Sequence, residues 1–230
     1  MQSQLRIAVP KGNNDVSHLF KQAGYPLPEG LDNSRKYIIP IPCTNLTFIL
    51  AKAIDIPTIV AYGAADVGIV GKEMLLENPR DVYELLDLAI TEGTIAVIGK
   101  PGHAKVNPQV ATPYSSITAA YYKNKGQQAE IIPLNGSLEL AISSGFVDCI
   151  VDLDDSIYVW EDAGLTLLDT IHRVSSRLIA NCASYMLRGD EIKLLCDRLS
   201  STISSMAALE ERTIAHILLE ERPSLGEKEL

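Results

Sequence analysis

Apolar residues follow two alternating patterns along this chain, and together they predict an α/β protein. Short apolar runs rich in Val, Ile and Leu are typical of buried strands. Segments whose apolar residues recur every three or four positions predict amphipathic helices that pack on a sheet. The predicted strands span residues 5–10, 36–41, 47–54, 65–71, 82–90, 94–99, 109–112, 129–134, 148–153, 165–173 and 176–187. The predicted helices span residues 15–24, 55–63, 72–77, 115–126, 137–145 and 190–221.

The order of these elements suggests two lobes. Residues 99–108, GKPGHAKVNP, form a turn-rich segment, after which a second series of strands and helices begins. No single Gly-, Pro- or Ser-rich linker divides the chain, so we expect more than one strand to cross between the two series. Such a protein has a central cleft, and in α/β folds ligands bind at the carboxyl ends of the strands.

Composition and charge then narrow the function. The chain has 230 residues and a net charge of −9, which disfavours nucleic-acid binding because that depends on clustered Lys and Arg. It has no signal-peptide pattern and no apolar run of about 18 residues, so the sequence predicts a cytoplasmic protein without a membrane partner. Its four cysteines and four histidines are scattered, which favours reduced thiols over disulfides or a zinc site.

One stretch raises a more specific question. Residues 148–165, DCIVDLDDSIYVWEDAGL, read as a buried strand that ends in a cluster of carboxylates and runs into a helix. Many α/β proteins hold a phosphate in such a loop, through backbone N–H groups and closely approaching glycines. Here Asp152, Asp154 and Asp155 occupy the loop, and no glycine precedes Gly164. Carboxylates at a helix start can cap the helix themselves and repel an anion.

Eight motifs occur in an ordered series over about residues 5 to 190. They are LRIAVPKG, NSRK, AIDIPTIVAYGAADVGIVGKEMLLE, VYELLDLA, QVAT, IIPLNGSLELA, CIVDL and SSRLIANCASY. In these motifs the chain resembles the short form of ATP phosphoribosyltransferase. The resemblance implies a two-lobed α/β fold with a central cleft, like the type II periplasmic-binding proteins. Residues 1–92 plus 176–230 would form the first lobe, and residues 93–175 the inserted second lobe with the loop for phosphoribosyl pyrophosphate (PRPP).

The resemblance also implies an activity and partners. Members of the family transfer phosphoribosyl from PRPP to N1 of ATP with Mg²⁺ and release pyrophosphate, which is the first step of histidine biosynthesis. The chain ends before the regulatory domain of the long form would begin, which implies the short form. That form usually works with a separate subunit that resembles a histidyl-tRNA synthetase. A homodimer or larger assembly is expected as well.

The matched motifs imply a set of site residues. Lys11, Arg35 and Lys52 are the expected catalytic cations, and Asp152 with Asp154 could hold magnesium. Substrate contacts are expected at Gly12, Lys36, Gly68, Gly71, Lys72, Asn135, Gly136, Ser137, Glu139, Asp152, Asp154, Asp155 and Ser156. The residues alone also allow simpler roles at these positions: polar turns, a solvated loop around residues 35–36, a strand-to-helix turn at Gly71, or a helix cap at Ser137.

Several positions depart from the family pattern and leave two hypotheses open. A basic residue is replaced at Asn13, Glu92, Thr94 and Pro113, while Lys52 stands where the family usually has arginine. The phosphate loop, an acidic residue followed by TGTT in the family, reads DSIYV at residues 155–159. The chain is thus either a working transferase or a degenerate paralogue that serves as a regulatory subunit or binds a different small molecule. A third possibility, a periplasmic-binding module, is disfavoured by the missing signal peptide.

Overall fold

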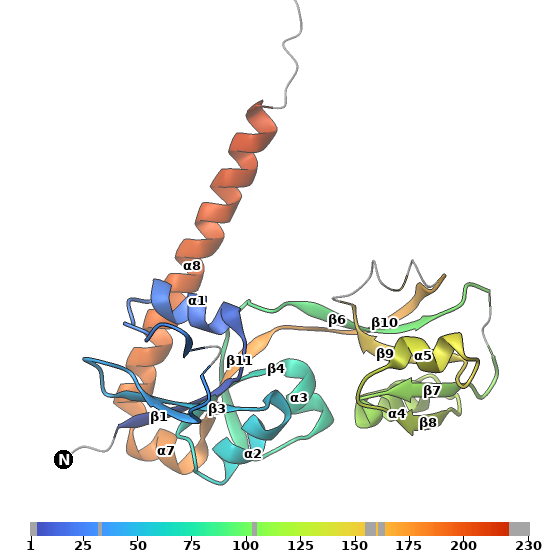
Figure 1. Cartoon of the computed structure of the whole chain (residues 1–230), viewed down its shortest axis with the longest axis horizontal. Coiled ribbons are helices and arrows are strands. Elements are labelled where there is room, and N and C mark those ends of the chain that lie inside the picture. The colour runs from blue at the N-terminus through green and yellow to red at the C-terminus, as the bar shows by residue number, and fades with distance from the viewer. Residues whose placement is uncertain (1–3, 32–33, 103–104, 155–159, 161–163, 221–230) are drawn as a thin grey trace, which may run out of the picture.

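The computed structural model describes residues 4–31, 34–102, 105–154, 160 and 164–220, with side chains up to residue 209. The strands are β1 Leu5–Pro10, β2 Ile38–Pro40, β3 Leu46–Ala51, β4 Val67–Gly71, β5 Val82–Asp87, β6 Gly93–Gly99, β7 Gln109–Thr112, β8 Glu130–Pro133, β9 Cys149–Leu153, β10 Thr166–Val174 and β11 Ser176–Asn181. The helices are α1 Asn14–Gln22, η2 Ala53–Asp55, α2 Ile56–Ala61, α3 Lys72–Glu77, α4 Ser115–Asn124, α5 Leu138–Ser143, α7 Cys182–Leu187 and α8 Gly189–Glu220. They form two α/β lobes, as predicted (Figure 1).

The first sheet has six strands in the order β2-β3-β1-β4-β11-β5. Strands β3, β1 and β4 are parallel, whereas β11 runs antiparallel to both β4 and β5. Helices α1 and α8 cover one face of this sheet, and α2 covers the other. Because both faces are covered, the central strands are apolar on both sides, which explains their continuous apolar runs in the sequence.

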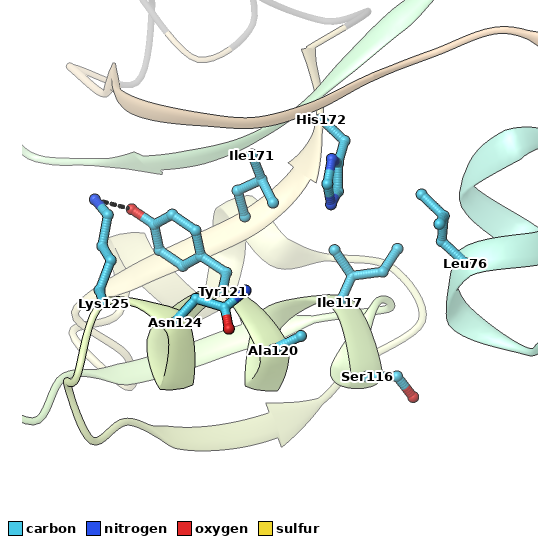
Figure 2. Close-up of a pocket in the computed structure, with 9 residues that line it drawn as sticks. All are labelled: Leu76, Ser116, Ile117, Ala120, Tyr121, Asn124, Lys125, Ile171 and His172. Carbon is cyan, nitrogen blue, oxygen red and sulfur yellow. Dashed lines mark hydrogen bonds between the residues drawn. The ribbon is translucent and has the colours of Figure 1, made fainter.

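The second sheet has five strands in the order β10-β6-β9-β7-β8. Strands β9, β7 and β8 are parallel, and β6 runs antiparallel to both β9 and β10. Helix α5 packs on one face, and α4 packs on the other. On the α4 face, the ring of Tyr121 lies against Ile171 of β10 (Figure 2).

Two chain crossings join the sheets, from β5 to β6 and from β10 back to β11. They are tied together because Ser175 Oγ donates to Asp87 Oδ1 at 2.8 Å and the Leu88 N–H donates to the Ser176 carbonyl at 2.9 Å. Strands within residues 5–87 and 176–181 build the first sheet, and strands within residues 93–174 build the second. We therefore propose that the lobes divide at residues 92–93 and 175–176.

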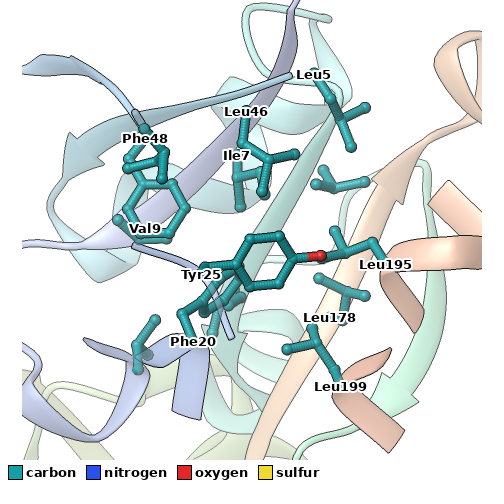
Figure 3. Close-up of a cluster of buried hydrophobic side chains, with 14 of the residues drawn as sticks. Leu5, Ile7, Val9, Phe20, Tyr25, Leu46, Phe48, Leu178, Leu195 and Leu199 are labelled. Carbon is teal, nitrogen blue, oxygen red and sulfur yellow. The ribbon is translucent and has the colours of Figure 1, made fainter. Parts of the chain in front are cut away.

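The core of the first lobe lies between its sheet and the two helices α1 and α8 (Figure 3). Phe20 of α1 packs edge-on against Phe48 of β3, with ring centroids 5.0 Å apart, and Tyr25 lies 5.3 Å from Phe20. Leu195 and Leu199 of α8 are buried in the same cluster. Each buried side chain of this size contributes about 1.5–3 kcal/mol, so this packing holds segments from both ends of the chain on one sheet.

One predicted strand is wrong in its second half. The pattern of residues 176–187 predicts an extended segment, but β11 ends at Asn181 and α7 begins at the next residue. Asn181 Oδ1 caps α7 by accepting from the Ser184 N–H at 2.9 Å. Its amide also donates to the carbonyls of Val60 and Ala61 at the end of α2. A contact with a distant helix thus ends the strand, and apolar periodicity carries no trace of it.

Helix α8 begins against the core and then projects away from both lobes (Figure 1). Up to residue 209, where its side chains are described, the buried residues of α8 are Ile192, Leu195 and Leu199, all in its first half. Among the described residues, no helix is both long and apolar enough to cross a membrane.

Candidate functional site

The strand directions bring the carboxyl ends of the parallel strands of both sheets to the boundary between the lobes. Strand β5 runs in the same direction as β4, because both are antiparallel to β11. The chain leaves the first sheet at the carboxyl end of β5, beside the ends of β1, β3 and β4. It enters the second sheet beside the end of β9, where Ile95 pairs with Leu153. The two edges at which α/β folds bind ligands therefore face each other across the connecting strands.

Lys11 and Lys52 lie side by side at the edge of the first sheet. The Lys11 N–H donates to the Ala51 carbonyl at 2.9 Å, and Lys52 is the next residue along the chain. The Lys11 ammonium also lies 5.4 Å from the ring centroid of Tyr37, a cation–π contact. The ends of β1 and β3 thus place two lysines with exposed side chains next to each other.

Arg35 and Lys36 directly precede Tyr37 and are therefore brought to the same edge. Both side chains are exposed. Among the residues that the structure describes, no carboxylate forms an ion pair with Arg35, Lys36, Lys11 or Lys52. The four charges are available to a polyanionic ligand.

Lys72 lies at this edge too, but its ammonium group already forms an ion pair within the protein. Its Nζ atom is 2.5 Å from Glu84 Oε2 on β5. Glu84 also faces the guanidinium of Arg177, whose Nε is 3.0 Å from Oε1. A phosphate at Lys72 would have to compete with this pair.

The three predicted glycines of the first lobe have different surroundings. Gly12 has a φ of +78° and open space where a side chain would lie, as a ligand-facing turn requires. Gly68 is the second residue of β4 and is buried; a Cβ there would lie 2.7 Å from Val60 Cγ2, so its structural role is to let α2 pack closely. At Gly71 a Cβ would lie 1.9 Å from the Glu73 carboxylate. Burial raises the pKa of Glu73.

Asn135, Gly136 and Ser137 form the exposed loop at the carboxyl end of β8. Ser137 occupies the N-cap position of α5, but its backbone is left-handed, with a φ of +53°, and its side chain makes no capping hydrogen bond. The hydroxyl expected to cap α5 is therefore free of that role. Glu139 follows in the first turn of α5 and is half-buried.

The predicted aspartates of the second lobe follow one another at the end of β9. Asp152 Oδ1 accepts from the Leu153 N–H at 2.9 Å. Asp154 Oδ1 accepts from the Thr94 N–H at 2.7 Å, so it joins the end of β9 to the start of β6. This bond differs from the helix cap that the sequence suggests for Asp154. Asp155 and Ser156, with the rest of the loop 155–159, lie outside the described residues.

The same carboxylates are the candidate ligands of a metal ion. Among the described residues there is no group of three or more His, Cys, Asp and Glu side chains that could hold a metal ion. Mg²⁺, however, is usually bound by one or two carboxylates together with the phosphates of a substrate. Asp152 and Asp154 therefore fit a magnesium ion that arrives with a phosphate ligand, and not a site made of protein alone.

A pocket of about 590 Å³ lies at the lobe boundary, between the two connecting strands and Asp154. Its lining residues are Asp87, Glu92, Gly93, Thr94, Asp154, Arg173, Val174, Ser175 and Arg177. We call it the boundary pocket. It holds the altered positions Glu92 and Thr94, so three carboxylates and two arginines now determine its charge.

Arg173 and Arg177 are cations of this pocket that sequence reasoning missed. Arg177 pairs with Glu84 and Asp87 of β5. Arg173 is exposed and has no ion-pair partner in the part of the chain that the structure describes. It lies directly opposite Thr94 in the pairing of β10 with β6. Only this strand register reveals its place, because the two residues are far apart in the sequence.

Comparison with known proteins decides the family. The family model described as ATP phosphoribosyltransferase matches residues 52–201. An ATP phosphoribosyltransferase of Geobacillus kaustophilus is 48% identical over 204 residues, which cover 86% of this chain and 98% of that protein. The chain belongs to the ATP phosphoribosyltransferase family. The Bacillus subtilis member is 43% identical over 208 residues, or 89% of this chain and 98% of its own length.

Two solved structures agree with the two-lobed fold of this family. One is titled as an ATP phosphoribosyl transferase (HisG:HisZ) complex from Thermotoga maritima; it matches with a TM-score of 0.74 and 25% identity, covering 88% of this chain and 100% of the matched chain. The other is the periplasmic aliphatic sulphonate binding protein SsuA from Escherichia coli, with a TM-score of 0.60, 15% identity and coverage of 94% and 77%. The second likeness concerns the fold alone and confirms the expected periplasmic-binding-protein-like architecture.

Proposed function

We propose that this chain transfers phosphoribosyl from PRPP to N1 of ATP and releases pyrophosphate, the first step of histidine biosynthesis. The observation that carries the proposal is the 48% identity to a named ATP phosphoribosyltransferase over 98% of that protein. The geometry supports it, because exposed cations at two strand ends lie at the lobe boundary, where polyanionic substrates can be gathered.

The reaction needs positioning and charge stabilisation more than a protein base. The lone pair of adenine N1 attacks C1 of the ribose, and the bond between C1 and the pyrophosphate oxygen breaks. Its electron pair leaves with pyrophosphate. Negative charge therefore grows on the leaving group while the ribose carbon becomes cationic, and fixed cations near the leaving group lower the barrier. N1 of neutral adenine carries no proton, so none has to be removed from the nucleophile.

The exposed cations of the first lobe are proposed to bind the phosphate groups. Lys11 and Lys52 would act as one pair at the ends of β1 and β3, and Arg35 with Lys36 would approach from the segment before β2. Arg173 would add a guanidinium from the connecting strand. Of these groups, the guanidinium ions can bind a phosphate through two parallel hydrogen bonds, which a lysine cannot do.

The second lobe is proposed to supply the remaining contacts and the metal site. Exposed groups of residues 135–137 would face the ribose or its 5′-phosphate. Mg²⁺ would enter with the pyrophosphate of PRPP, with Asp152 and Asp154 as its nearest carboxylates, and would neutralise the leaving group when bound. Within the described part of the chain the Thr94 N–H bonds only to Oδ1 of Asp154, which leaves Oδ2 for this task.

A regulatory partner and self-association are part of the same proposal. The matched Thermotoga maritima structure is titled as a complex of two different proteins. We therefore propose a separate regulatory subunit that resembles a histidyl-tRNA synthetase, together with a homodimer or larger assembly of this 25.0 kDa chain. Sedimentation at micromolar concentration should give a mass above that of one chain. A monomer both alone and with the partner would contradict the assembly.

The activity is tested by following pyrophosphate release and the mass of the nucleotide product after incubation with PRPP, ATP and Mg²⁺. The wild-type chain, alone or with its partner, should form phosphoribosyl-ATP. Replacing Lys11→Ala should lower kcat/KM by about 100-fold, the usual effect of losing one group that stabilises developing charge. Lys21→Ala, at the other end of α1, removes the same charge away from the boundary and should behave as wild type. Absence of product and of PRPP binding by calorimetry would overturn the proposal.

A further inference from the structure

A second contact between the lobes lies on the opposite face of the connecting strands from the boundary pocket. His172 and Arg173 are neighbours on β10, so their side chains point to opposite faces of the strand. Arg173 lines the boundary pocket, whereas His172 lines a groove of about 380 Å³ with residues of α3 and α4. In this groove Leu76 of α3 points toward Ile117 of α4 and toward His172 (Figure 2). The first lobe therefore touches the second behind the pocket.

Glu77 makes the polar part of this contact. Both of its carboxylate oxygens accept from the Ser116 N–H at 2.9 Å, and Oε2 also accepts from the Ile117 N–H at 3.1 Å. These N–H groups belong to the first turn of α4 and have no partner within their own helix. Tyr114, at the N-cap position of α4, makes no side-chain capping bond. A carboxylate from one lobe thus caps a helix of the other, where the helix dipole favours negative charge.

The apolar part of the contact comes from the same helix. Met74 and Leu76 of α3 pack against the cluster of buried residues between α4 and the second sheet. Met74 also packs against the cluster beneath α2 in the first lobe. Helix α3 is therefore held to both lobes, and Glu77 lies at its end nearest the second. These polar and apolar contacts together join α3 of the first lobe to α4 of the second, and we call this contact the seam.

We propose that Glu77 is a positioning residue, whose bond to α4 holds the boundary pocket open and is released as the lobes close around the substrates. The seam and the pocket lie on opposite faces of the connecting strands. A rotation about these strands that narrows the pocket therefore separates α3 from α4. The seam opposes closure, so substrates bind less tightly than they would to lobes free to close. The proposal rests on the proposed function only for the choice of PRPP as the ligand.

The test compares the wild-type protein with Glu77→Ala, Glu77→Gln and a matched control, Glu130→Ala. Glu130 accepts a comparable hydrogen bond from Gln109 Nε2 at 3.0 Å, but entirely within the second lobe. For Glu77→Ala we expect the Kd and KM for PRPP to fall about fivefold, which is the loss of one helix cap converted at tenfold per 1.4 kcal/mol. The kcat should be unchanged or lower. Glu77→Gln keeps one acceptor oxygen, so its Kd for PRPP should lie between the values of Glu77→Ala and the wild type. The Kd of Glu130→Ala should equal that of the wild type.

A Kd for PRPP that is unchanged or higher in Glu77→Ala would overturn the proposal. Amide hydrogen exchange adds a measurement on the unaltered protein. Saturating PRPP should speed exchange at Ser116 and Ile117, whose N–H groups lose their acceptor on closure, and unchanged or slower exchange there counts against release.

Small-angle scattering without ligand separates this proposal from the proposed function. Glu77→Ala should have a smaller radius of gyration than the wild type, because the bond that holds the lobes in the open arrangement is lost. Glu130→Ala should have the same radius as the wild type. If the wild type fails to bind PRPP, the proposed function fails, but the scattering still decides the role of Glu77. Equal radii of gyration for Glu77→Ala and the wild type would show that Glu77 does not hold the lobes open.

Discussion

Arg173 shows how one side chain can carry charge into a pocket from a neighbouring strand. Its partner across the ladder is Thr94, one of the positions at which the sequence resemblance implies a basic residue in the family. The guanidinium enters the same pocket from β10. A residue that lies outside the matched family motifs can therefore supply an anion contact, because cross-strand neighbours share one face of the sheet.

Removing this guanidinium should weaken PRPP binding. We expect Arg173→Ala to raise the Kd for PRPP about tenfold, a value in the range for losing one charge-assisted contact. Arg173→Lys should recover part of the loss, since it keeps the charge but not the two-bond geometry. Calorimetric titration measures both, with Lys123→Ala at the exposed end of α4 as the control. Equal affinity in wild type and Arg173→Ala would exclude Arg173 from the site.

At the scale of elements, the packing of α2 on β4 depends on the absence of a side chain at Gly68. A Cβ there would lie 2.7 Å from Val60 Cγ2 and 2.8 Å from Ile56 Cγ2, both on α2. Helix and strand could not keep their present spacing around it. The glycine that the motif suggests as a ligand contact is thus explained by helix–sheet packing.

Gly68→Ala should therefore lower stability by about 1–3 kcal/mol, the usual cost of overpacking. Gly189→Ala is the matched control, because nothing lies within 4 Å of its Cβ position. That variant should be neutral or slightly stabilising, since alanine favours the helix. Urea denaturation followed by circular dichroism measures both. A Gly68→Ala protein as stable as the control variant would show that α2 can move aside at no cost.

At the scale of the whole molecule, Asp66 gathers segments from both ends of the chain at the edge of the first sheet away from the site. It accepts from the backbone and guanidinium of Arg6 on β1, from Ser184 Oγ on α7, and from Arg188 just before α8. Burial alone would raise the pKa of Asp66, but the hydrogen bonds from Arg6 and Ser184 outweigh it and hold the pKa below its usual value. The ionised form thus stabilises the fold.

The sign of this shift gives a pH dependence. Because the pKa of Asp66 is lower in the folded chain than the unfolded value of about 3.9, its stabilisation is present above that pH and is lost as the pH falls further. Asp66→Asn should lower the free energy of unfolding by about 2 kcal/mol at pH 7. This is less than the loss on breaking a fully buried ion pair, because Arg6 is partly exposed. The difference from wild type should shrink below about pH 4. Urea denaturation at pH 7, 5 and 3 measures it, and a difference that does not change with pH would contradict this account.

Most of the local elements, and the family, can be recognised from the amino-acid sequence. Helix α3 spans the predicted residues 72–77, and β7 spans the predicted residues 109–112, because apolar runs and the polar residues around them are local signals. The two lobes follow from the order of the elements and from the matched motifs, and the predicted strand 5–10 already places Lys11 directly after a strand. These features arise from residues that are close together in the sequence, so the order of the amino acids is enough to predict them. Lys52 lies inside the predicted strand 47–54, and it comes to a strand end because β3 stops at Ala51.

Contacts between residues far apart in the sequence are visible only in the folded protein. Asn181 ends β11 because it reaches the end of α2, Gly68 is small because α2 lies over it, and Glu77 caps a helix of the other lobe. Arg173 lies opposite Thr94 through strand register. Each of these roles depends on a partner far away in the sequence. No local pattern encodes such a pairing, because it arises only when the sheets, the helices on them and the two crossings are assembled together.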